Sequence, residues 1–67
     1  MNIELETNLI DNEVISREPD IDIDLKDDEY VLENTTREWG KGYKKIDDWH
    51  FVILKKLNET SYLLKRV

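Results

Sequence analysis

The chain has 67 residues, 16 of them acidic and 10 basic, with no cysteine and a formal net charge of −6 at pH 7. So short a chain forms one domain at most, here residues 1–67, and its core is expected to contribute only about 3–5 kcal/mol. The lack of cysteine excludes disulfides and thiolate metal sites, and it is typical of a reducing compartment. Self-association remains as a means of stabilising the domain, so we consider a homodimer.

The sequence also indicates the cellular location of the protein. No segment approaches the roughly 20 consecutive apolar residues of a membrane span. Acidic Glu4 and Glu6 lie near the start of the chain, and no basic region leads an apolar stretch there, so we expect no signal peptide. We therefore expect a cytoplasmic protein, in the host cytoplasm if it is phage-encoded, with no membrane partner.

Charge is distributed unevenly along the chain. Residues 1–34 hold twelve acidic and two basic side chains, whereas residues 35–67 hold eight basic and four acidic ones. The two halves therefore either attract each other within the fold or face different partners.

The first two elements are predicted to be strands. Apolar side chains alternate with glutamates over Ile3–Leu9, which predicts a half-buried strand. A second short strand is expected over Glu13–Arg17. Pro19 follows and blocks both a continuing helix and a central strand.

The clearest pattern in the chain runs from Asp20 to Leu25, where aspartates alternate with aliphatic side chains without exception. This period of two predicts a strand with one acidic, solvated face. A polar turn and the apolar Tyr30–Leu32 come next, so we expect a hairpin across residues 20–34. Residues 35–48 are interpreted as a linker with a turn or a single helical turn around Trp39.

The segment 49–67 fits two structures. In the first, strands over His50–Leu57 and Ser61–Val67 form a hairpin, which the aromatic and β-branched run 51–54 favours. In the second, residues 47–57 form a helix, because apolar side chains recur there at spacings of three and four and Asp47 can cap its start.

The predicted fold is mainly β, a small antiparallel sheet of four or five strands with one short helix allowed. An α+β fold is the alternative if residues 47–57 are helical. The expected core draws on apolar side chains from every predicted strand: Ile3, Leu5, Leu9, Ile21, Ile23, Leu25, Val31, Trp49, Phe51, Ile53, Leu57, Leu63 and Val67.

Residue patterns for catalysis or metal binding are sparse. His50 is the one histidine and lies in the most apolar stretch, where a structural role is favoured over that of a base. A calcium loop beginning at Asp20 would need glycine and glutamate at the positions held by Leu25 and Val31. No glycine-rich phosphate loop is present. We expect no enzymatic activity, no cofactor and no metal site.

The acidic run is the strongest candidate for a binding surface. Its predicted strand and turn would project a row of six carboxylates: Asp20, Asp22, Asp24, Asp27, Asp28 and Glu29. Alternate residues of a strand stand about 6.6 Å apart. Such a row can imitate the charge of a nucleic-acid backbone and occupy the basic channel of an enzyme that binds one. The alternative is a solvated strand face without a partner.

A second candidate surface lies in the basic half. Arg37, Trp39 and Tyr43 interleave with lysines, as cations and aromatic rings do in sites for single-stranded nucleic acid. The overall negative charge opposes that partner, so direct nucleic-acid binding is not expected. These three residues are secondary candidates for a protein contact, or else pack on the sheet.

The stretch Trp49-His50-Phe51-Val52-Ile53, followed by a polar turn and a final strand, is similar to the end of phage uracil-DNA glycosylase inhibitors. Proteins of that family are small acidic DNA mimics. The likeness is confined to this terminal segment, and neither membership nor any site residue is inferred from it.

Together these features predict a small acidic protein that binds and inhibits a nucleic-acid-handling enzyme by electrostatic DNA mimicry. Inhibitors carried by phages and mobile elements against host defences act in this way. The partner is expected to carry a basic nucleic-acid-binding surface. Two alternatives stay open: an antitoxin or immunity-type partner of one cognate toxin, and a small structural protein of a virion or other assembly.

Overall fold

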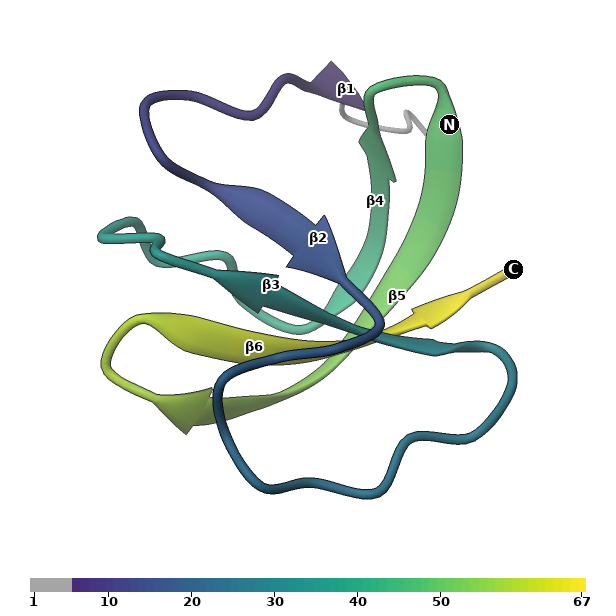
Figure 1. Ribbon diagram of the computed structural model, residues 1–67. Helices are drawn as coiled ribbons and strands as arrows, with labels where there is room; N and C mark the ends of the chain where they lie inside the picture. Colours follow the sequence, from purple (N-terminus) through teal and green to yellow (C-terminus); the bar gives the residue numbers. More distant parts are fainter. Residues whose placement is uncertain (1–5) are drawn as a thin grey trace.

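The computed structural model describes residues 6–67, and side chains from Asn8 onward. The described chain forms one six-stranded sheet with the spatial order β1-β4-β5-β6-β3-β2 (Figure 1). Its strands are β1 (Glu6–Thr7), β2 (Val14–Ser16), β3 (Glu29–Glu33), β4 (Gly42–Ile46), β5 (Trp49–Asn58) and β6 (Ser61–Arg66).

The prediction of a mainly β fold with an antiparallel sheet is confirmed. Strands β2, β3, β6, β5 and β4 pair with their neighbours antiparallel, and only β1 joins parallel, beside β4. No helix forms between Glu6 and Val67, so the α+β alternative is wrong. It follows that this part of the chain has no helix of the length and apolar character needed to cross a membrane.

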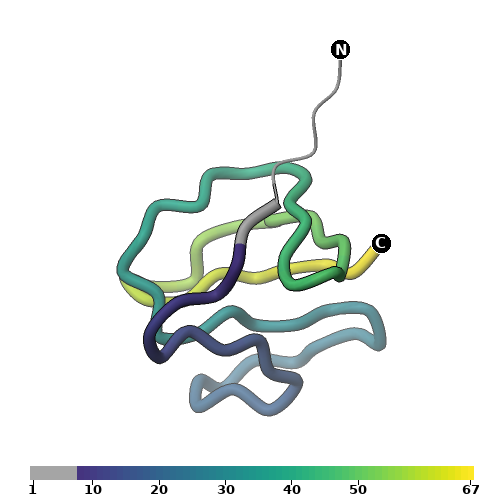
Figure 2. Tube along the Cα trace, turned by 90° about the horizontal axis from the view of Figure 1, so that it is seen from above, coloured from purple at the N-terminus to yellow at the C-terminus, as the bar shows by residue number. Residues whose placement is uncertain are grey.

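The sheet is curled because consecutive strands lie at its opposite edges. β1 and β2 follow each other in sequence, yet they occupy the two ends of the strand order. Residues 8–13 connect them across the open side of the sheet (Figure 1). Figure 2 shows the same connection from above, running from beside β4 down to β2. The curl turns one face of every long strand toward a common interior.

The C-terminal hairpin is confirmed in place of the helix. β5 and β6 pair through Asn58 and Ser61, with Glu59 and Thr60 forming the turn. The Asn58 side-chain oxygen accepts a hydrogen bond from the Thr60 backbone amide at 2.9 Å, which closes this turn. The β-branched and aromatic residues at the start of β5 suit a buried strand and override the helical spacing.

The interpretation of residues 35–48 as a linker is wrong over Gly42–Ile46, which form β4. β4 pairs with β5 through a two-residue turn in which Asp47 and Asp48 have φ of 47° and 72°. Positive φ at both central residues is the conformation whose twist matches a tight hairpin, and aspartate tolerates it better than most residues. Gly42 has φ of 107°, a conformation that favours glycine.

The strand and hairpin predicted for residues 20–34 are wrong. Residues 17–28 form an irregular loop, and β3 pairs with β2 and β6 instead. The alternation nevertheless holds in exposure, because Ile21, Ile23 and Leu25 are half-buried whereas the aspartates between them are exposed. A period of two reports which side chains face the protein, but strand formation also needs an adjacent backbone to pair with.

Two of the remaining strand predictions match strands of the structure, and one matches only in part. β2 falls within the predicted Glu13–Arg17, and β3 contains the predicted Tyr30–Leu32. Of the first predicted strand, only Glu6–Thr7 is a strand among the described residues, and Ile3 and Leu5 lie outside them.

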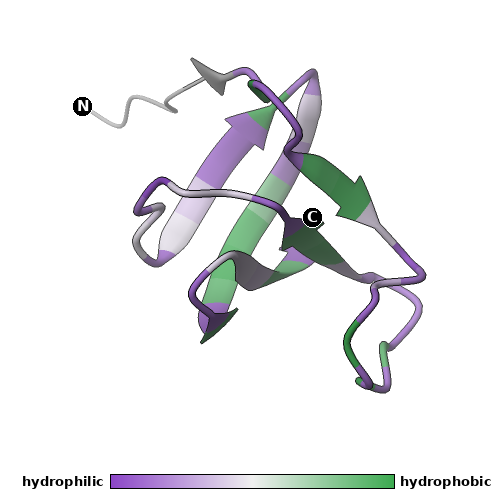
Figure 3. Cartoon of the chain, turned by 60° about the vertical axis from the view of Figure 1, so that its left-hand side comes forward, coloured by the Kyte–Doolittle hydropathy of each residue, from purple (hydrophilic) through white to green (hydrophobic). Residues whose placement is uncertain are grey.

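The core lies on the inner face of the curl. Its buried cluster combines side chains from β3, β4, β5, β6 and the segment before β4: Leu32, Trp39, Ile46, Phe51, Ile53, Tyr62 and Leu64. Of the predicted core, Val31, Phe51, Ile53 and Leu63 are buried, and Leu9 and Leu57 are half-buried. Figure 3 shows hydrophobic residues on β2 and in the middle of β5, and both hydrophobic and hydrophilic residues in the loop between β2 and β3.

Two predicted core residues are exposed. Trp49 is 47% exposed and Val67 is 53% exposed. Both stand at the ends of their strands, Trp49 opening β5 directly after the tight turn and Val67 following β6. The prediction that they belong to the core is therefore wrong.

Candidate partner-binding surfaces

The acidic loop, residues 17–28, connects β2 to β3 and is the large bend below β3 in Figure 1. One nitrogen of the Arg17 guanidinium, Nη1, donates to three backbone carbonyls, those of Lys26 at 2.9 Å, Asp27 at 2.5 Å and Glu29 at 3.1 Å. The same guanidinium lies 5.3 Å from the centre of the Tyr30 ring. Arg17 therefore clamps the two ends of the loop together.

Further hydrogen bonds hold the loop against the strands beside it. The Asp20 amide donates to a carboxylate oxygen of Glu33 at 3.1 Å, and the Glu18 amide donates to the Ser16 hydroxyl at 2.9 Å. At its other end, the Lys26 amide donates to the Glu29 carboxylate at 2.9 Å. The loop is thus irregular in secondary structure but attached at several points.

The structure brings all six predicted acidic residues to this loop and its junction with β3. Asp20, Asp22, Asp24 and Asp27 are exposed, and none forms an ion pair with another described residue. An Asp28 carboxylate oxygen lies 3.7 Å from the ammonium nitrogen of Lys65. The Glu29 carboxylate accepts a hydrogen bond from the Lys26 backbone amide. Four of the six carboxylates therefore project into solvent with no ion-pair partner among residues 8–67.

The second group of predicted contact residues is not brought together on a surface. Trp39 is only 6% exposed and belongs to the core, where its indole nitrogen donates to the Thr35 hydroxyl at 2.9 Å. The Arg37 guanidinium is bound to Glu13. Only Tyr43, which is 61% exposed, presents its ring to solvent. Of the two readings left open for these residues, packing on the sheet is the one that holds for Trp39.

Glu13 is a buried acid that the sequence analysis missed. Its two carboxylate oxygens accept hydrogen bonds from the Arg37 side chain, one of 2.9 Å from Nε and one of 2.5 Å from Nη2. The Thr35 hydroxyl donates to it at 2.6 Å and the Ile10 amide at 2.9 Å. Nothing in the local pattern marks this residue, because its partners come from distant parts of the chain.

This network fixes the charge state of Glu13. The hydrogen bonds from Arg37 lower the pKa of the carboxyl from 4.5 to about 2, although its burial acts in the opposite direction. The same pair raises the pKa of Arg37. The guanidinium also lies 4.6 Å from the Trp39 ring. Glu13 thus attaches the connection between β1 and β2 to the segment before β4, which is a structural role.

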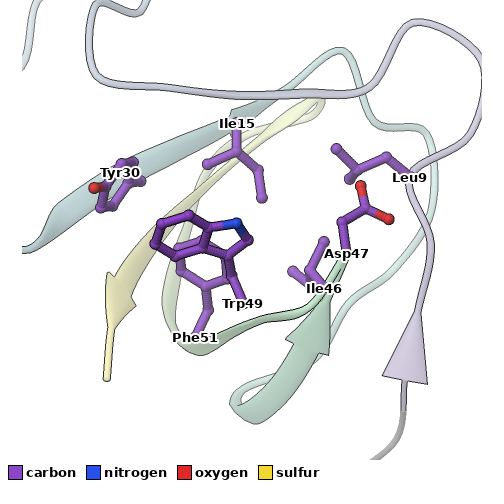
Figure 4. A pocket seen from close by; sticks show the side chains of 7 residues that line it. All are labelled: Leu9, Ile15, Tyr30, Ile46, Asp47, Trp49 and Phe51. Atoms are coloured by element: carbon purple, nitrogen blue, oxygen red, sulfur yellow. The ribbon is translucent and has the colours of Figure 1, made fainter.

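An apolar cleft of about 400 Å³ opens on the inner face of the sheet. It is lined by side chains from the N-terminal connection, β2, β3 and the β4–β5 hairpin: Leu9, Ile15, Tyr30, Ile46, Asp47, Trp49 and Phe51 (Figure 4). Tyr30 and Phe51 meet edge to face, with ring centres 5.7 Å apart. In Figure 4 the Asp47 carboxylate projects between Ile46 and Leu9.

The cleft lies next to the end of the acidic loop. The guanidinium of Arg66 stacks on the Trp49 ring at 3.6 Å from its centre. The backbone amide of the same Arg66 donates to the Asp28 carbonyl at 2.7 Å. One residue therefore contacts both the aromatic rim of the cleft and the last residue of the loop.

No arrangement typical of metal binding was found in the part of the chain that is described, where no three His, Cys, Asp or Glu side chains gather suitably. His50 is exposed on β5. No protein-family model matches the chain, and no significant match exists among curated proteins or solved structures. Its function must therefore be argued from the two surfaces themselves.

Proposed function

We propose that the protein is a non-enzymatic inhibitor that binds the basic surface of a nucleic-acid-handling protein through its acidic loop. The observation that carries the proposal is the exposure of Asp20, Asp22, Asp24 and Asp27 on one loop without ion-pair partners among the described residues. Lysine and arginine side chains of a partner would supply the missing cations. Occupation of that basic surface would exclude its nucleic acid.

The physical chemistry favours such a contact. Charges of one sign on a protein surface steer a partner of opposite charge and raise the association rate, most strongly at low salt. A basic channel gathers counterions or phosphates, and a carboxylate row that replaces them gives a steep dependence on salt concentration. The Arg17 clamp reduces the conformational freedom that the loop would lose on binding, which lowers the entropic cost of the contact.

The test compares two triple variants with the same change in charge. In the loop variant, Asp22→Asn, Asp24→Asn and Asp27→Asn remove three exposed carboxylates. In the control variant, Asp11→Asn and Glu59→Gln at two turns, together with Asp48→Asn, remove three exposed carboxylates elsewhere.

The tagged protein and both variants are incubated with nuclease-treated bacterial lysate at low and high salt, and the retained proteins are identified by mass spectrometry. We expect the wild type and the control to retain one nucleic-acid enzyme at low salt, to lose it at high salt, and to release it when a DNA duplex is added. Retention by the loop variant equal to that of the wild type would refute the proposal. A cognate partner that is indifferent to salt and to DNA would favour a toxin partner, and large oligomers in light scattering would favour an assembly protein.

A further inference from the structure

We propose that the apolar cleft is the specificity pocket of the same partner-binding surface, and that it takes one large apolar side chain of the partner followed by a lysine or arginine that pairs with Asp47. The inference rests on the proposed function in one respect, that the partner is a protein with basic side chains. The acidic loop would then supply long-range attraction, and the cleft would supply the specific contact.

The lining of the cleft favours an apolar guest. Six of its seven lining side chains are aliphatic or aromatic. Leu9, Ile15 and Tyr30 remain half-buried in the protein alone, and Trp49 is exposed over nearly half of its surface. Covering this apolar area with a partner's side chain is favourable in proportion to the area removed from water. A cleft of about 400 Å³ lies at the small end of the range for ligand sites, so it suits a side chain better than a large ligand.

The aromatic rim is held in place before a partner arrives. Arg66 stacks on the Trp49 ring, and Phe51 meets Tyr30 edge to face. Rings fixed by such contacts lose little side-chain freedom on binding, and Trp and Tyr are the residues most often found at the energetic centre of protein interfaces.

The charges around the cleft select the residue beside the guest. The two guanidinium groups near its aromatic rings are engaged, Arg66 on Trp49 and Arg17 on the carbonyls of the loop. Asp47 is the charged residue of the lining, and it forms no ion pair with another described residue. Asp48, the next residue, is exposed and does not line the cleft. A cationic side chain placed at this end of the cleft would pair with the Asp47 carboxylate, the one charged group among the described lining residues.

The same charges argue against a second copy of this chain as the occupant. The protein carries a net charge of −6, and the acidic loop ends beside the cleft. Two copies approaching through this surface would bring both acidic loops together, and like charges oppose that approach. A basic segment of another protein meets no such repulsion.

The experiment uses short capped peptides of glycine and serine that carry a central Leu-Lys pair, with Ala-Lys and Leu-Gln peptides as probes of each half of the contact. Binding to the full chain is followed by two-dimensional ¹H–¹⁵N NMR. We expect Leu-Lys to shift the amide signals of Ile15, Tyr30, Asp47 and the Trp49 indole, and each altered peptide to bind at least about tenfold more weakly. If the Leu-Lys peptide shifts the NMR signals of residues outside the cleft instead, the inference is overturned by the wild-type protein alone.

Two pairs of variants separate the contribution of the Trp49 ring to peptide binding from that of the Asp47 carboxylate. Trp49→Ala is expected to weaken Leu-Lys binding at least tenfold, whereas the control Tyr43→Ala, an exposed aromatic residue outside the cleft, leaves it unchanged. Asp47→Asn is expected to weaken Leu-Lys but not Leu-Gln, and the control Asp48→Asn to change neither. Equal binding by Trp49→Ala and the wild type would overturn the inference.

Failure of the cleft inference can be told apart from failure of the proposed function of the acidic loop. If the loop triple variant loses its partner while Trp49→Ala retains it, the loop proposal stands and the cleft inference fails. If the loop variant keeps its partner and Trp49→Ala loses it, the loop proposal fails and the cleft is the contact. A dimer of the wild type in sedimentation that Trp49→Ala abolishes would identify a second copy as the occupant and overturn the inference.

Discussion

The buried Glu13–Arg37 pair predicts a specific loss of stability in acid. Glu13 has a side chain only 3% exposed, and its two oxygens accept hydrogen bonds from the guanidinium of Arg37. Protonation of this carboxyl would replace an acceptor of charged hydrogen bonds by a neutral acid and leave the guanidinium without its anion. We expect this one group to dominate the acid sensitivity of the fold.

The magnitude follows from the pKa. The pKa of Glu13 falls from 4.5 to about 2 on folding. Because each pKa unit corresponds to about 1.4 kcal/mol, this shift contributes roughly 3 kcal/mol to the free energy of unfolding. A folded pKa below the unfolded value means that the contribution is full above about pH 4.5, declines as the pH falls toward 2, and is absent below both values. For a domain of this size it is a large share of the total.

Two measurements test this prediction. NMR titration of the Glu13 carboxyl in the intact protein should give a pKa near 2, and urea unfolding should show the free energy of unfolding decreasing by roughly 3 kcal/mol between pH 5 and pH 2 because of this group. Glu13→Gln should be less stable at neutral pH and should lose that part of the pH dependence, whereas Glu38→Gln at an exposed position should keep it. A Glu13 pKa near 4.5 in the folded protein would refute the reasoning.

Three further predictions concern stability. Asp48→Gly should raise the free energy of unfolding by about 0.5–1 kcal/mol in thermal melts, because glycine adopts the positive φ of this turn without strain, and a lower melting temperature would contradict that. Ile53→Val should cost about 1 kcal/mol in urea unfolding, since the side chain is 2% exposed, whereas Ile10→Val at a 47% exposed position should cost nothing measurable. Lys56→Ala should leave the urea midpoint unchanged, because the Lys56–Glu38 pair is exposed, and a clear loss would show that the pair stabilises the sheet.

The sequence is most informative where pairing is local. β5 and β6 are adjacent in sequence and joined by a short polar turn, so composition favoured the hairpin over the helix that the apolar spacing also allowed. β4 escaped prediction because Lys44 and Lys45 dilute its apolar pattern, and because its turn uses Asp47 and Asp48 rather than the Asn-Gly pair that most clearly indicates a tight hairpin.

The alternation from Asp20 to Leu25 shows what a period of two can and cannot establish. It correctly identified which side chains are exposed, and three of the four exposed carboxylates of the candidate site, Asp20, Asp22 and Asp24, follow from it. It could not identify the missing strand partner, because hydrogen-bonding neighbours of a backbone are a property of the whole sheet. The row of charge is therefore carried by a clamped loop rather than by a strand.

The cleft and the Glu13 network lay beyond sequence reasoning for a related reason. Leu9, Ile15, Tyr30 and Trp49 come from four parts of the chain that meet only after the sheet has curled. Trp49 was expected in the core with the other apolar residues, yet its place at the start of β5 leaves it at the rim of the cleft. Sites built by long-range contact require the strand order, which one sequence does not provide.

The strand order has a consequence for synthesis. β6 is the last described strand to leave the ribosome, yet it lies between β5 and β3 and gives each of them an antiparallel neighbour. Until Ser61–Arg66 have emerged, β3 and β5 lack the strand that pairs with both of them. A premature stop before Ser61 would therefore separate the β2–β3 pair from β1, β4 and β5 instead of shortening the sheet at one edge.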